Sequence, residues 1–274
     1  MPELPEVETI RRDLTTRIVG RSFAAVTLNW PKMVQIPSPE AFSHRLVGQC
    51  IRELDRRGKY LILRLASGET LILHLMMSGS LLLDPQGDPD PYSRAVFLLD
   101  DGAHLHFRDP RKLGKMWLVE DESMVLGRLG PEPLSPGFTA EVLRERVKKR
   151  SAPIKAVLCD QSFLAGVGNM YADEALFAAG IHPLRTAMSL STEEIAQLHR
   201  ALHQVLQEAI GSHGASISSG TWWRPDGQIG TAQIVFKVAH SSFQPCPVCA
   251  TPIERIPIRG RGTYFCPNCQ RKSP

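Results

Sequence analysis

Cys246-Pro247-Val248-Cys249 and Cys266-Pro267-Asn268-Cys269 are two C-x2-C pairs, separated by sixteen residues near the end of a chain of 274 residues. Each pair can offer two thiolates to one tetrahedral Zn²⁺ ion. Because four protein ligands leave no open position on the metal, this spacing predicts one structural zinc ion bound by Cys246, Cys249, Cys266 and Cys269. Two disulfides or four free thiols are the alternatives.

The cysteines also help to predict the cellular compartment of the protein. The first residues do not resemble a signal peptide, and no run approaches the roughly 18 apolar residues that cross a membrane. We therefore expect a reducing cytoplasm, where thiols bind metal rather than cross-link. Cys50 and Cys159 have no partner at ligand spacing and are expected to fill space in the core.

Composition is that of an ordinary globular protein, with 43% hydrophobic and 22% charged residues and enough length for two domains. The formal net charge is only +4. Basic residues nevertheless cluster in four places, at 56–59, 108–115, 144–155 and 255–261. Such a spread favours one long phosphate-facing groove, and hence a nucleic acid partner, with ordinary solvated faces as the alternative.

Upstream of the cysteines the chain is expected to be helical. Helices are predicted at 139–149, 153–161 and 170–179, followed by a long helix that Ser191 opens with Glu194 in capping-box register. Residues 165–169 form a glycine-containing turn whose N–H groups and helix dipole suit a phosphate, although an ordinary helix connection has the same pattern. The proline-rich stretch 131–137 is expected to be an interdomain linker.

The first half of the chain has a strand pattern. After one helix, marked by Val7, Ile10, Leu14 and Ile18 and ended by Gly20, strands are predicted from about 23 to 118. Segments 60–65 and 70–76, and segments 95–99 and 104–107, flank turn residues and predict two hairpins. Their nearly continuous apolar residues predict a sheet buried on both faces, as in a sandwich.

The chain begins Met1-Pro2-Glu3-Leu4-Pro5-Glu6. Removal of Met1 would make Pro2 the amino terminus, and an α-amino group is far more often neutral at pH 7 than lysine. A secondary amine that attacks a carbonyl-like carbon gives an iminium, which acidifies neighbouring C–H bonds and permits elimination. Glu3 is next in sequence and can supply the proton transfers. A simple helix start is the alternative reading of Pro2 and Pro5.

Together these elements resemble one family, the bacterial formamidopyrimidine-DNA glycosylases, which excise oxidised purines such as 8-oxoguanine. The resemblance covers nearly the whole chain. It rests on the initial Pro-Glu-Leu-Pro-Glu-Val-Glu-Thr and on the motifs at 56–60, 74–79, 109–112, 129–134 and 166–174, together with the four cysteines.

The resemblance implies an α+β fold with three parts. These are an N-terminal β-sandwich catalytic domain with flanking helices at 1–134, a helix-two-turn-helix DNA-binding domain at 135–240, and a C-terminal zinc-finger β-hairpin at 241–274. It also implies a protein that binds damaged double-stranded DNA in the bacterial cytoplasm, removes the base and cleaves the strand by β,δ-elimination. We expect a monomer, because the sequence has no heptad pattern or other dimer signature.

Roles are implied residue by residue. Pro2 resembles the nucleophile that forms a Schiff base with the sugar, and Glu3 the general acid and base. Lys59 matches the lysine of β-elimination and Arg261 the arginine of δ-elimination.

An extruded base leaves a hole in the duplex that side chains must fill. The family's counterparts are Met77, Arg111 and Leu113, where leucine replaces the usual phenylalanine and implies a weaker wedge. The remaining DNA contacts implied by the resemblance are Glu6, His74, Tyr92, Arg150, Lys155 and Asn169. Tyr92 stands where the family commonly has histidine.

The larger departure lies in 219–230 and in the strand 234–240 that follows. In the family this loop closes over the extruded base, so base preference is the property most affected. Trp222 and Trp223 are expected either to stack on a base or to anchor the loop in the core. The alternatives to an oxidised-purine glycosylase are the same chemistry on oxidised pyrimidines, against which Leu4 argues, and a non-catalytic damage-binding protein.

Overall fold

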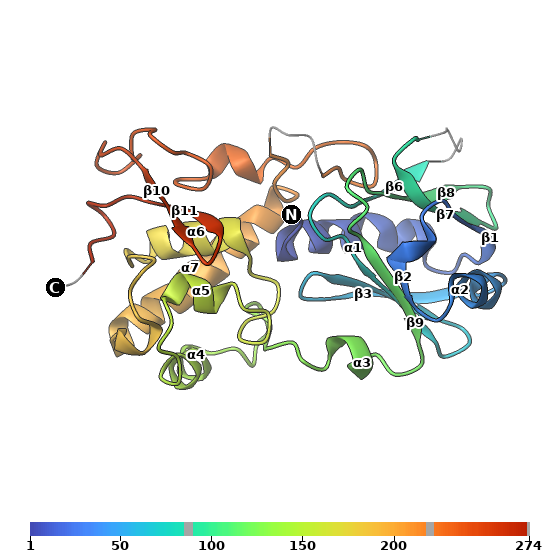
Figure 1. Cartoon of the computed structure of the whole chain (residues 1–274), viewed down its shortest axis with the longest axis horizontal. Coiled ribbons are helices and arrows are strands. Elements are labelled where there is room, and N and C mark those ends of the chain that lie inside the picture. Colours follow the sequence, from blue (N-terminus) through green and yellow to red (C-terminus); the bar gives the residue numbers. More distant parts are fainter. Residues whose placement is uncertain (85–89, 218–221, 273–274) are drawn as a thin grey trace. The chain divides into compact units, whose positions relative to one another are not determined.

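The computed structural model describes residues 1–84, 90–217 and 222–272 (Figure 1). The chain forms two compact units, and neither is one continuous stretch of sequence. The amino-terminal unit consists of Met1–Arg128 with Ser212–Gln233, and the carboxy-terminal unit of Leu129–Gly211 with Ile234–Pro274. The chain therefore leaves the second unit after its longest helix, returns to the first for one segment, and comes back for the cysteine pairs.

The amino-terminal unit contains two sheets. One has the strand order β2-β9-β5-β4-β3 and the other β1-β7-β8-β6, and all neighbours are antiparallel except β2 and β9. The strands are β1 (Phe23–Leu28), β2 (Val34–Ile36), β3 (Ile51–Arg57), β4 (Tyr60–Leu65), β5 (Thr70–His74), β6 (Ser80–Asp84), β7 (Ser93–Leu99), β8 (His104–Arg108) and β9 (Lys115–Val119).

Both predicted hairpins are present, since β4 pairs with β5 and β7 with β8. β5 ends at His74, earlier than predicted, because Met76 has φ +54° and turns the chain. β4 and β5 are mostly buried, whereas β7 alternates buried and half-buried residues. The four-stranded sheet is therefore not closed on both faces, contrary to the prediction.

Helix α1 (Leu4–Ile18) packs on β3 and places its predicted apolar face in the core, with Val7, Ile10, Leu14 and Ile18 fully buried. Helix α2 (Pro39–Leu46) was not predicted, because it buries only Phe42 and Leu46 and gives a weak periodicity. Its start is nevertheless marked by the side chain of Ser38, which accepts from the N–H of Ala41. The unit also contains η1 (Pro31–Met33) and α3 (Ser123–Leu126).

The carboxy-terminal unit is helical, as predicted. Its elements are α4 (Ala140–Val147), α5 (Ile154–Leu158), α6 (Asn169–Ala178), η2 (Ala187–Ser189) and α7 (Thr192–Gly211). The capping box of α7 is confirmed, because the N–H of Ser191 donates to Glu194 Oε2 and the N–H of Glu194 donates to Ser191 Oγ. Both α4 and α6 pack on α7. No helix in the described ranges is long and apolar enough to span a membrane.

The last part of the chain is a small module around the cysteines. After η3 (Ala232–Val235), strands β10 (Glu254–Ile258) and β11 (Arg261–Phe265) form an antiparallel hairpin between the two cysteine pairs. Val238, Ile253, Cys246 and Cys266 form its buried core. Gln270 donates to the carbonyl of Ile181 (2.9 Å), which fastens the module to the chain after α6.

Candidate functional site

The start of α1 carries the residues predicted for amine chemistry. Pro2, Glu3 and Glu6 are buried, with Glu3 and Glu6 each only 1% exposed. Glu3 is the N-cap residue of α1, and Pro5 occupies the first turn, where its missing N–H has no cost. The N–H of Glu3 donates to Glu6 Oε2 (2.7 Å). Glu6, predicted as a DNA contact, is instead buried and fixes the backbone that carries Glu3.

The amino group of the chain lies among several charges. It belongs here to Met1, and removal of that residue transfers it to Pro2. Burial lowers the pKa of this amino group from 8.0, Glu3 and Glu6 oppose the shift, and Lys59 adds to it. A lowered pKa leaves more of the amine neutral and nucleophilic near pH 7. The structure thus places the amine, both glutamates and the predicted lysine at one corner.

Lys59 occupies the two-residue turn between β3 and β4. Arg57 and Tyr60 pair at the base of this turn, and Gly58 has φ +59°, which glycine adopts at little cost. Lys59 is 4% exposed. Arg56, in the same predicted basic cluster, donates to Glu8 Oε2 (3.1 Å). The charge of Arg56 is therefore neutralised inside the unit, and Arg56 is not the phosphate contact that the cluster predicted.

His74, at the end of β5, is held as a neutral imidazole. Burial, with smaller contributions from the charges of Lys59 and Lys115, lowers its pKa from 6.5 to about 4. Its Nδ1 accepts from the N–H of Met76 (3.0 Å), so Nε2 carries the hydrogen of the neutral ring. His74 can therefore donate one hydrogen bond from Nε2, as a phosphate contact requires.

A buried aspartate joins the two loops that carry Met77 and Arg111. Asp109 is 1% exposed, and its Oδ1 accepts from Ser78 Oγ (2.5 Å) and from the N–H of Arg111 (3.2 Å). Its Oδ2 accepts from the N–H of Leu113 (2.6 Å). Met77 is 44% exposed and Arg111 is exposed, so these loops present side chains to solvent from a rigid base. Arg111 also lowers the pKa of the terminal amine, so its guanidinium lies near that amine.

The ring of Tyr92 lies close to two arginine side chains. Its ring centroid lies 5.8 Å from the guanidinium carbon of Arg94 and 4.8 Å from that of Arg108. Arg108 also pairs with Asp90 (2.9 Å), which neutralises part of this predicted basic cluster. Tyr92 itself is 43% exposed.

The two adjacent tryptophans take different positions. Trp222 is 3% exposed and belongs to the core of the amino-terminal unit, so it is an anchor. Trp223 is half-buried, donates its backbone N–H to Ser80 Oγ (3.0 Å), and lies with its ring 5.4 Å from the guanidinium carbon of Arg108. Residues 219–221 of the same predicted loop lie outside the described residues.

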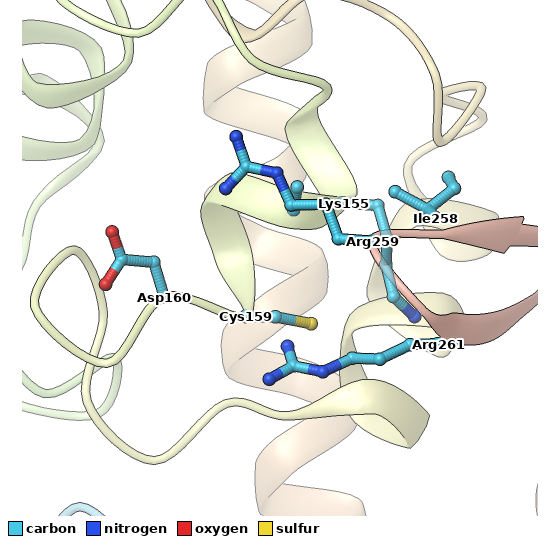
Figure 2. Close-up of a pocket in the computed structure, with 7 residues that line it drawn as sticks. Lys155, Cys159, Asp160, Ile258, Arg259 and Arg261 are labelled. Carbon is cyan, nitrogen blue, oxygen red and sulfur yellow. The ribbon is translucent and has the colours of Figure 1, made fainter.

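The carboxy-terminal unit contains a cationic pocket of about 170 Å³. Figure 2 shows that its walls come from α5 and from the β10–β11 hairpin, with Lys155, Arg259 and Arg261 around the thiol of Cys159. Three cations around one small cavity suit an anion such as a phosphate. Cys159 is buried, as predicted, but it lines this pocket rather than only filling the core.

Lys155 is held rigidly behind this pocket. It is 1% exposed, forms an ion pair with Asp173 and donates to the carbonyl of Asn169 (2.6 Å). Burial raises the pKa of Asp173 above its usual range, and Lys155 opposes that shift. Asn169 in turn donates from Nδ2 to the carbonyl of Gly262 (2.8 Å). The predicted residues Lys155, Asn169 and Arg261 are thus brought together.

The predicted turn in this unit needs adjustment, and the predicted DNA contact Arg150 lies apart from the pocket of Lys155. The turn 165–169 was expected to offer open N–H groups, but the N–H of Gly166 donates to Gln161 Oε1 (2.9 Å). Arg150 does not line the pocket of Lys155; it lies at a separate cavity of about 310 Å³, with its guanidinium carbon 5.6 Å from the ring of Phe163.

The four predicted cysteines fit a zinc ion. Their ligand atoms all lie within 4.8 Å of one another, and none forms a disulfide. The sulfur atoms of Cys246 and Cys269 are 3.8 Å apart, and those of Cys249 and Cys266 are 3.4 Å apart. A tetrahedral site with Zn–S bonds of about 2.3 Å requires sulfur atoms about 3.8 Å apart, so the donor set matches one structural Zn²⁺.

Comparison with known proteins agrees with this geometry along the whole chain. Three family models match: the formamidopyrimidine-DNA glycosylase N-terminal domain at 1–116, the H2TH domain of the same enzymes at 129–221, and a zinc finger found in FPG and IleRS at 243–271. Formamidopyrimidine-DNA glycosylase from Herpetosiphon aurantiacus is 45% identical over 275 residues, which cover 98% of this chain and 100% of the relative. The chain belongs to the formamidopyrimidine-DNA glycosylase family.

Other members of the family confirm the fold. The glycosylase from Geobacillus kaustophilus is 44% identical over 99% of this chain and 100% of its own. The solved MutM (FPG) protein from Thermus thermophilus has a TM-score of 0.91 and 42% identity over 100% of both chains. Lactococcus lactis Fpg in complex with abasic-site DNA has a TM-score of 0.91 and 34% identity over 98% of this chain and 100% of its own. The α+β fold, the zinc finger and the class of enzyme, a DNA glycosylase, are therefore as predicted.

Three residues that organise this glycosylase were not predicted. They are Asp109, Asp173 and Glu174, and all three are buried carboxylates. Glu174 accepts from the backbone N–H groups of Val238 (2.9 Å) and Ala239 (2.8 Å), as well as that of the residue before them. The signal for the last two was the pair of acidic residues inside the otherwise apolar helix α6.

Proposed function

We propose that this glycosylase excises oxidised purines, such as 8-oxoguanine and formamidopyrimidines, from duplex DNA and then cleaves the strand. The observation that carries this proposal is the amino-terminal corner of the chain, where Pro2 and Glu3 are buried and the amino group of Met1 lies beside Glu3 and Lys59. A DNA-binding protein without catalysis has no need for a nucleophilic amine next to a carboxylate. Lactococcus lactis Fpg has been solved with Fapy-dG DNA, which supports purine lesions as substrates.

The first step is base removal. The lone pair of the Pro2 amine forms a bond to the sugar C1′ while the glycosidic bond breaks, and the departing base takes the bond electrons and the proton that the amine nitrogen releases. Opening of the sugar ring at O4′ requires a second proton, which Glu3 supplies, and leaves a Schiff base between Pro2 and C1′. Glu6 holds the backbone of Glu3 in place for this transfer.

Strand cleavage follows from the iminium. A base removes a proton from C2′, a C=C bond forms, and the 3′ phosphate departs with the electrons of its C–O bond; we assign this β-elimination to Lys59. Loss of a proton from C4′ then expels the 5′ phosphate, and we assign that δ-elimination to Arg261. Arg261 is a cation that can also stabilise a departing phosphate, and Lys59 becomes one when it accepts the C2′ proton.

The DNA is held by contacts from both units. We assign Met77, Arg111 and Leu113 to the space vacated by the extruded nucleotide. His74, Lys155 and Asn169 are assigned to the flanking phosphates. Tyr92 and Arg150 are assigned to the outer backbone.

The remaining features complete the proposal. The bound zinc ion would hold the hairpin that carries Arg261 in one conformation, through Cys246, Cys249, Cys266 and Cys269. We propose the domain boundaries 1–134, 135–240 and 241–274, and a bacterial cytoplasmic location, where these thiols stay reduced.

Borohydride trapping tests the proposal. A duplex with 8-oxoguanine opposite cytosine is incubated with wild type and with Pro2→Gly, and the covalent protein–DNA band is scored, while intact mass establishes that Met1 has been removed. We expect a band from the wild type that is strongly reduced in the variant. If the wild type gives no band on this duplex but does give one on a duplex with an oxidised pyrimidine, the substrates are oxidised pyrimidines. If it gives no band on either duplex or on an abasic site, the protein binds damaged DNA without catalysis.

Lys59→Ala separates the two reactions. Base release should be reduced only a few fold, whereas strand cleavage should fall on the order of 100-fold, because proton abstraction loses its general base. Free base and cleaved strand are measured in the same reaction. An equal fall in both would contradict the role assigned to Lys59.

A further inference from the structure

The turn of the β10–β11 hairpin consists of Arg259 and Gly260. Ile258 and Arg261 pair at its base, and both turn residues have positive φ, +48° for Arg259 and +74° for Gly260. Turns of this geometry favour asparagine, aspartate or glycine at the first position, because other side chains strain a left-handed backbone. The turn itself therefore does not require an arginine, and any role of Arg259 lies in its side chain.

The side chain of Arg259 lines the cationic pocket of about 170 Å³. Figure 2 shows the guanidinium groups of Arg259 and Arg261 extending from the hairpin toward α5, on either side of the Cys159 thiol. The thiol donates to the carbonyl of Gly168 (3.4 Å), so it is neutral and does not offset their charge. The two guanidinium groups thus face one small cavity from two sides.

Neither arginine is neutralised by an acidic residue. In the part of the chain that the structure describes, no carboxylate forms an ion pair with Arg259 or Arg261, whereas Lys155 is already paired inside the unit. Asp160 also lines the pocket, but it accepts from the N–H and the hydroxyl of Ser162 (3.0 and 2.7 Å). Figure 2 shows its carboxylate directed away from the thiol. The pocket is therefore suited to an anion with more than one negative charge.

A phosphate at the end of a cleaved strand is such an anion. A phosphate within a strand is a diester with one negative charge, whereas a terminal phosphate is a monoester with close to two near pH 7. In the proposed δ-elimination, C4′ releases its proton to water and the electrons of that C–H bond form a C=C bond. The C5′–O bond then breaks, and its electron pair stays on the phosphate oxygen. The phosphate gains its second negative charge in this step.

We propose that Arg259 is a second phosphate-binding residue of the δ-elimination and acts together with Arg261. Its guanidinium binds the phosphate that leaves C5′, so the charge that develops on the oxygen meets two cations rather than one. Loss of Arg259 therefore slows the second cleavage of the strand relative to the first. This inference rests on the proposed function, in which the strand is cleaved twice.

The two cleavages leave different ends and can be measured separately. A duplex with 8-oxoguanine, labelled at the 5′ end of the damaged strand, is incubated with excess enzyme. Denaturing gels separate the labelled product that keeps an unsaturated aldehyde at its 3′ end from the product that ends in phosphate. Arg259→Asn should slow conversion of the first into the second on the order of tenfold. Asparagine suits this turn, so the variant should keep the hairpin.

Two further variants complete the test. Arg259→Lys should lie between the wild type and Arg259→Asn, because lysine keeps the charge but not the paired N–H groups. Arg255→Gln is the matched control. Arg255 is exposed in the same hairpin, with its guanidinium carbon 5.9 Å from the ring of Tyr264, and it does not line the pocket. Its ratio of the two products should equal that of the wild type.

Each outcome decides the inference. A selective accumulation of the aldehyde-ended product in Arg259→Asn supports it. An unchanged ratio in Arg259→Asn, the same change in Arg255→Gln, or an equal slowing of base release and both cleavages overturns it and leaves the glycosylase intact. A wild type that stops at the aldehyde contradicts the assigned δ-elimination and this inference. A wild type that releases no base contradicts the proposed function itself.

Discussion

Glu6 and Glu174 are both buried glutamates that accept hydrogen bonds from backbone N–H groups. The two segments that they bind follow each other closely in sequence but belong to different units. Glu6 binds Ala215 to α1 in the amino-terminal unit, and Glu174 binds residues 237–239 to α6 in the carboxy-terminal unit. The division between the two units falls between these attachments, at Gln233. Two carboxylates of similar burial thus each bind one of these segments to its own unit.

The two attachments differ in what else they hold. Glu6 also accepts from the N–H of Glu3, so it connects the segment at Ala215 to Glu3, whereas Glu174 receives consecutive N–H groups of the segment that leads into the zinc module. The backbone differs as well: Gly214 supplies the positive φ beside Glu6, while His240 and Phe243 adopt φ +62° and +65° beyond Glu174. We therefore expect a change of Glu6 to lower activity more than stability, and a change of Glu174 to do the reverse.

Glu174→Ala should have the largest effect. It would leave buried N–H groups without an acceptor and should lower the free energy of unfolding of the carboxy-terminal unit by about 3 kcal/mol or more, with easier zinc loss. Urea unfolding and zinc release to a chelator measure both. Glu208→Ala, at an exposed position of α7, is the control. Unchanged zinc retention would show that Glu174 does not support the module.

Glu6→Gln should act mainly on the reaction. An amide can keep only one of the two acceptor positions, so Glu3 or Ala215 shifts, and excision of 8-oxoguanine should fall on the order of 10- to 100-fold. The free energy of unfolding should change by less than in Glu174→Ala. Single-turnover rates and urea unfolding give the two numbers, and a variant with normal rates but poor stability would reverse the comparison.

The pH dependence of stability should differ in sign between the units. The pKa of His74 is about 4 in the folded unit against 6.5 in the unfolded chain, so the unfolded chain binds more protons between these values and this contribution to stability falls as pH drops through 6.5 toward 4. The slope is at most about 1.4 kcal/mol per pH unit.

Asp173 has the opposite sign. Its folded pKa is raised above 3.8, so the folded state binds more protons just above that value, and its contribution to stability falls as pH rises. Hydrogen exchange of β5 and α6 amides, converted to opening free energies across pH 4 to 7, would separate the two trends, and His74→Gln should flatten the first. Parallel slopes in both units would contradict the assignment.

Phe243→Gly should have the smallest effect, and a stabilising one. The phenylalanine is 86% exposed, so little packing is lost, and glycine removes the cost of a left-handed backbone. We expect a gain of up to about 1 kcal/mol. Gly214→Ala, which adds a side chain at positive φ against Glu6, should do the reverse. Thermal unfolding measures both, and a loss in Phe243→Gly would assign the ring a packing role.

Local signals in the sequence predicted much of this molecule. The spacing of the cysteines, the apolar positions of α1 and the hairpin turns each act over a few residues, and each is confirmed. The helix α2 was missed because it is short and buries few side chains. β7 was read as buried on both faces because two of its half-buried residues, Val96 and Leu98, are also apolar.

The site was predictable where residue type alone implies chemistry. Pro2, Glu3 and Lys59 were selected for their reactive groups, and the structure brings them together. Asp109 was not found, although the N–H groups of Arg111 and Leu113 that it accepts from are close in sequence. Glu174 was not found either, since it accepts backbone hydrogen bonds from Val238 and Ala239, far along the chain, and a carboxylate in sequence does not show which N–H groups it will meet. The same holds for Arg56, whose charge is neutralised by Glu8 from another element.

Because the two units are interleaved in sequence, the amino-terminal unit cannot be completed until late in synthesis of the chain. Residues 1–128 emerge from the ribosome first, but the core they form is completed by Trp222, which is made almost a hundred residues later. The catalytic corner would likewise wait for Ala215 to engage Glu6. A nascent or prematurely terminated chain therefore carries the proposed nucleophile, Pro2, without its finished surroundings, and we expect the enzyme to become active only when most of its length has been translated.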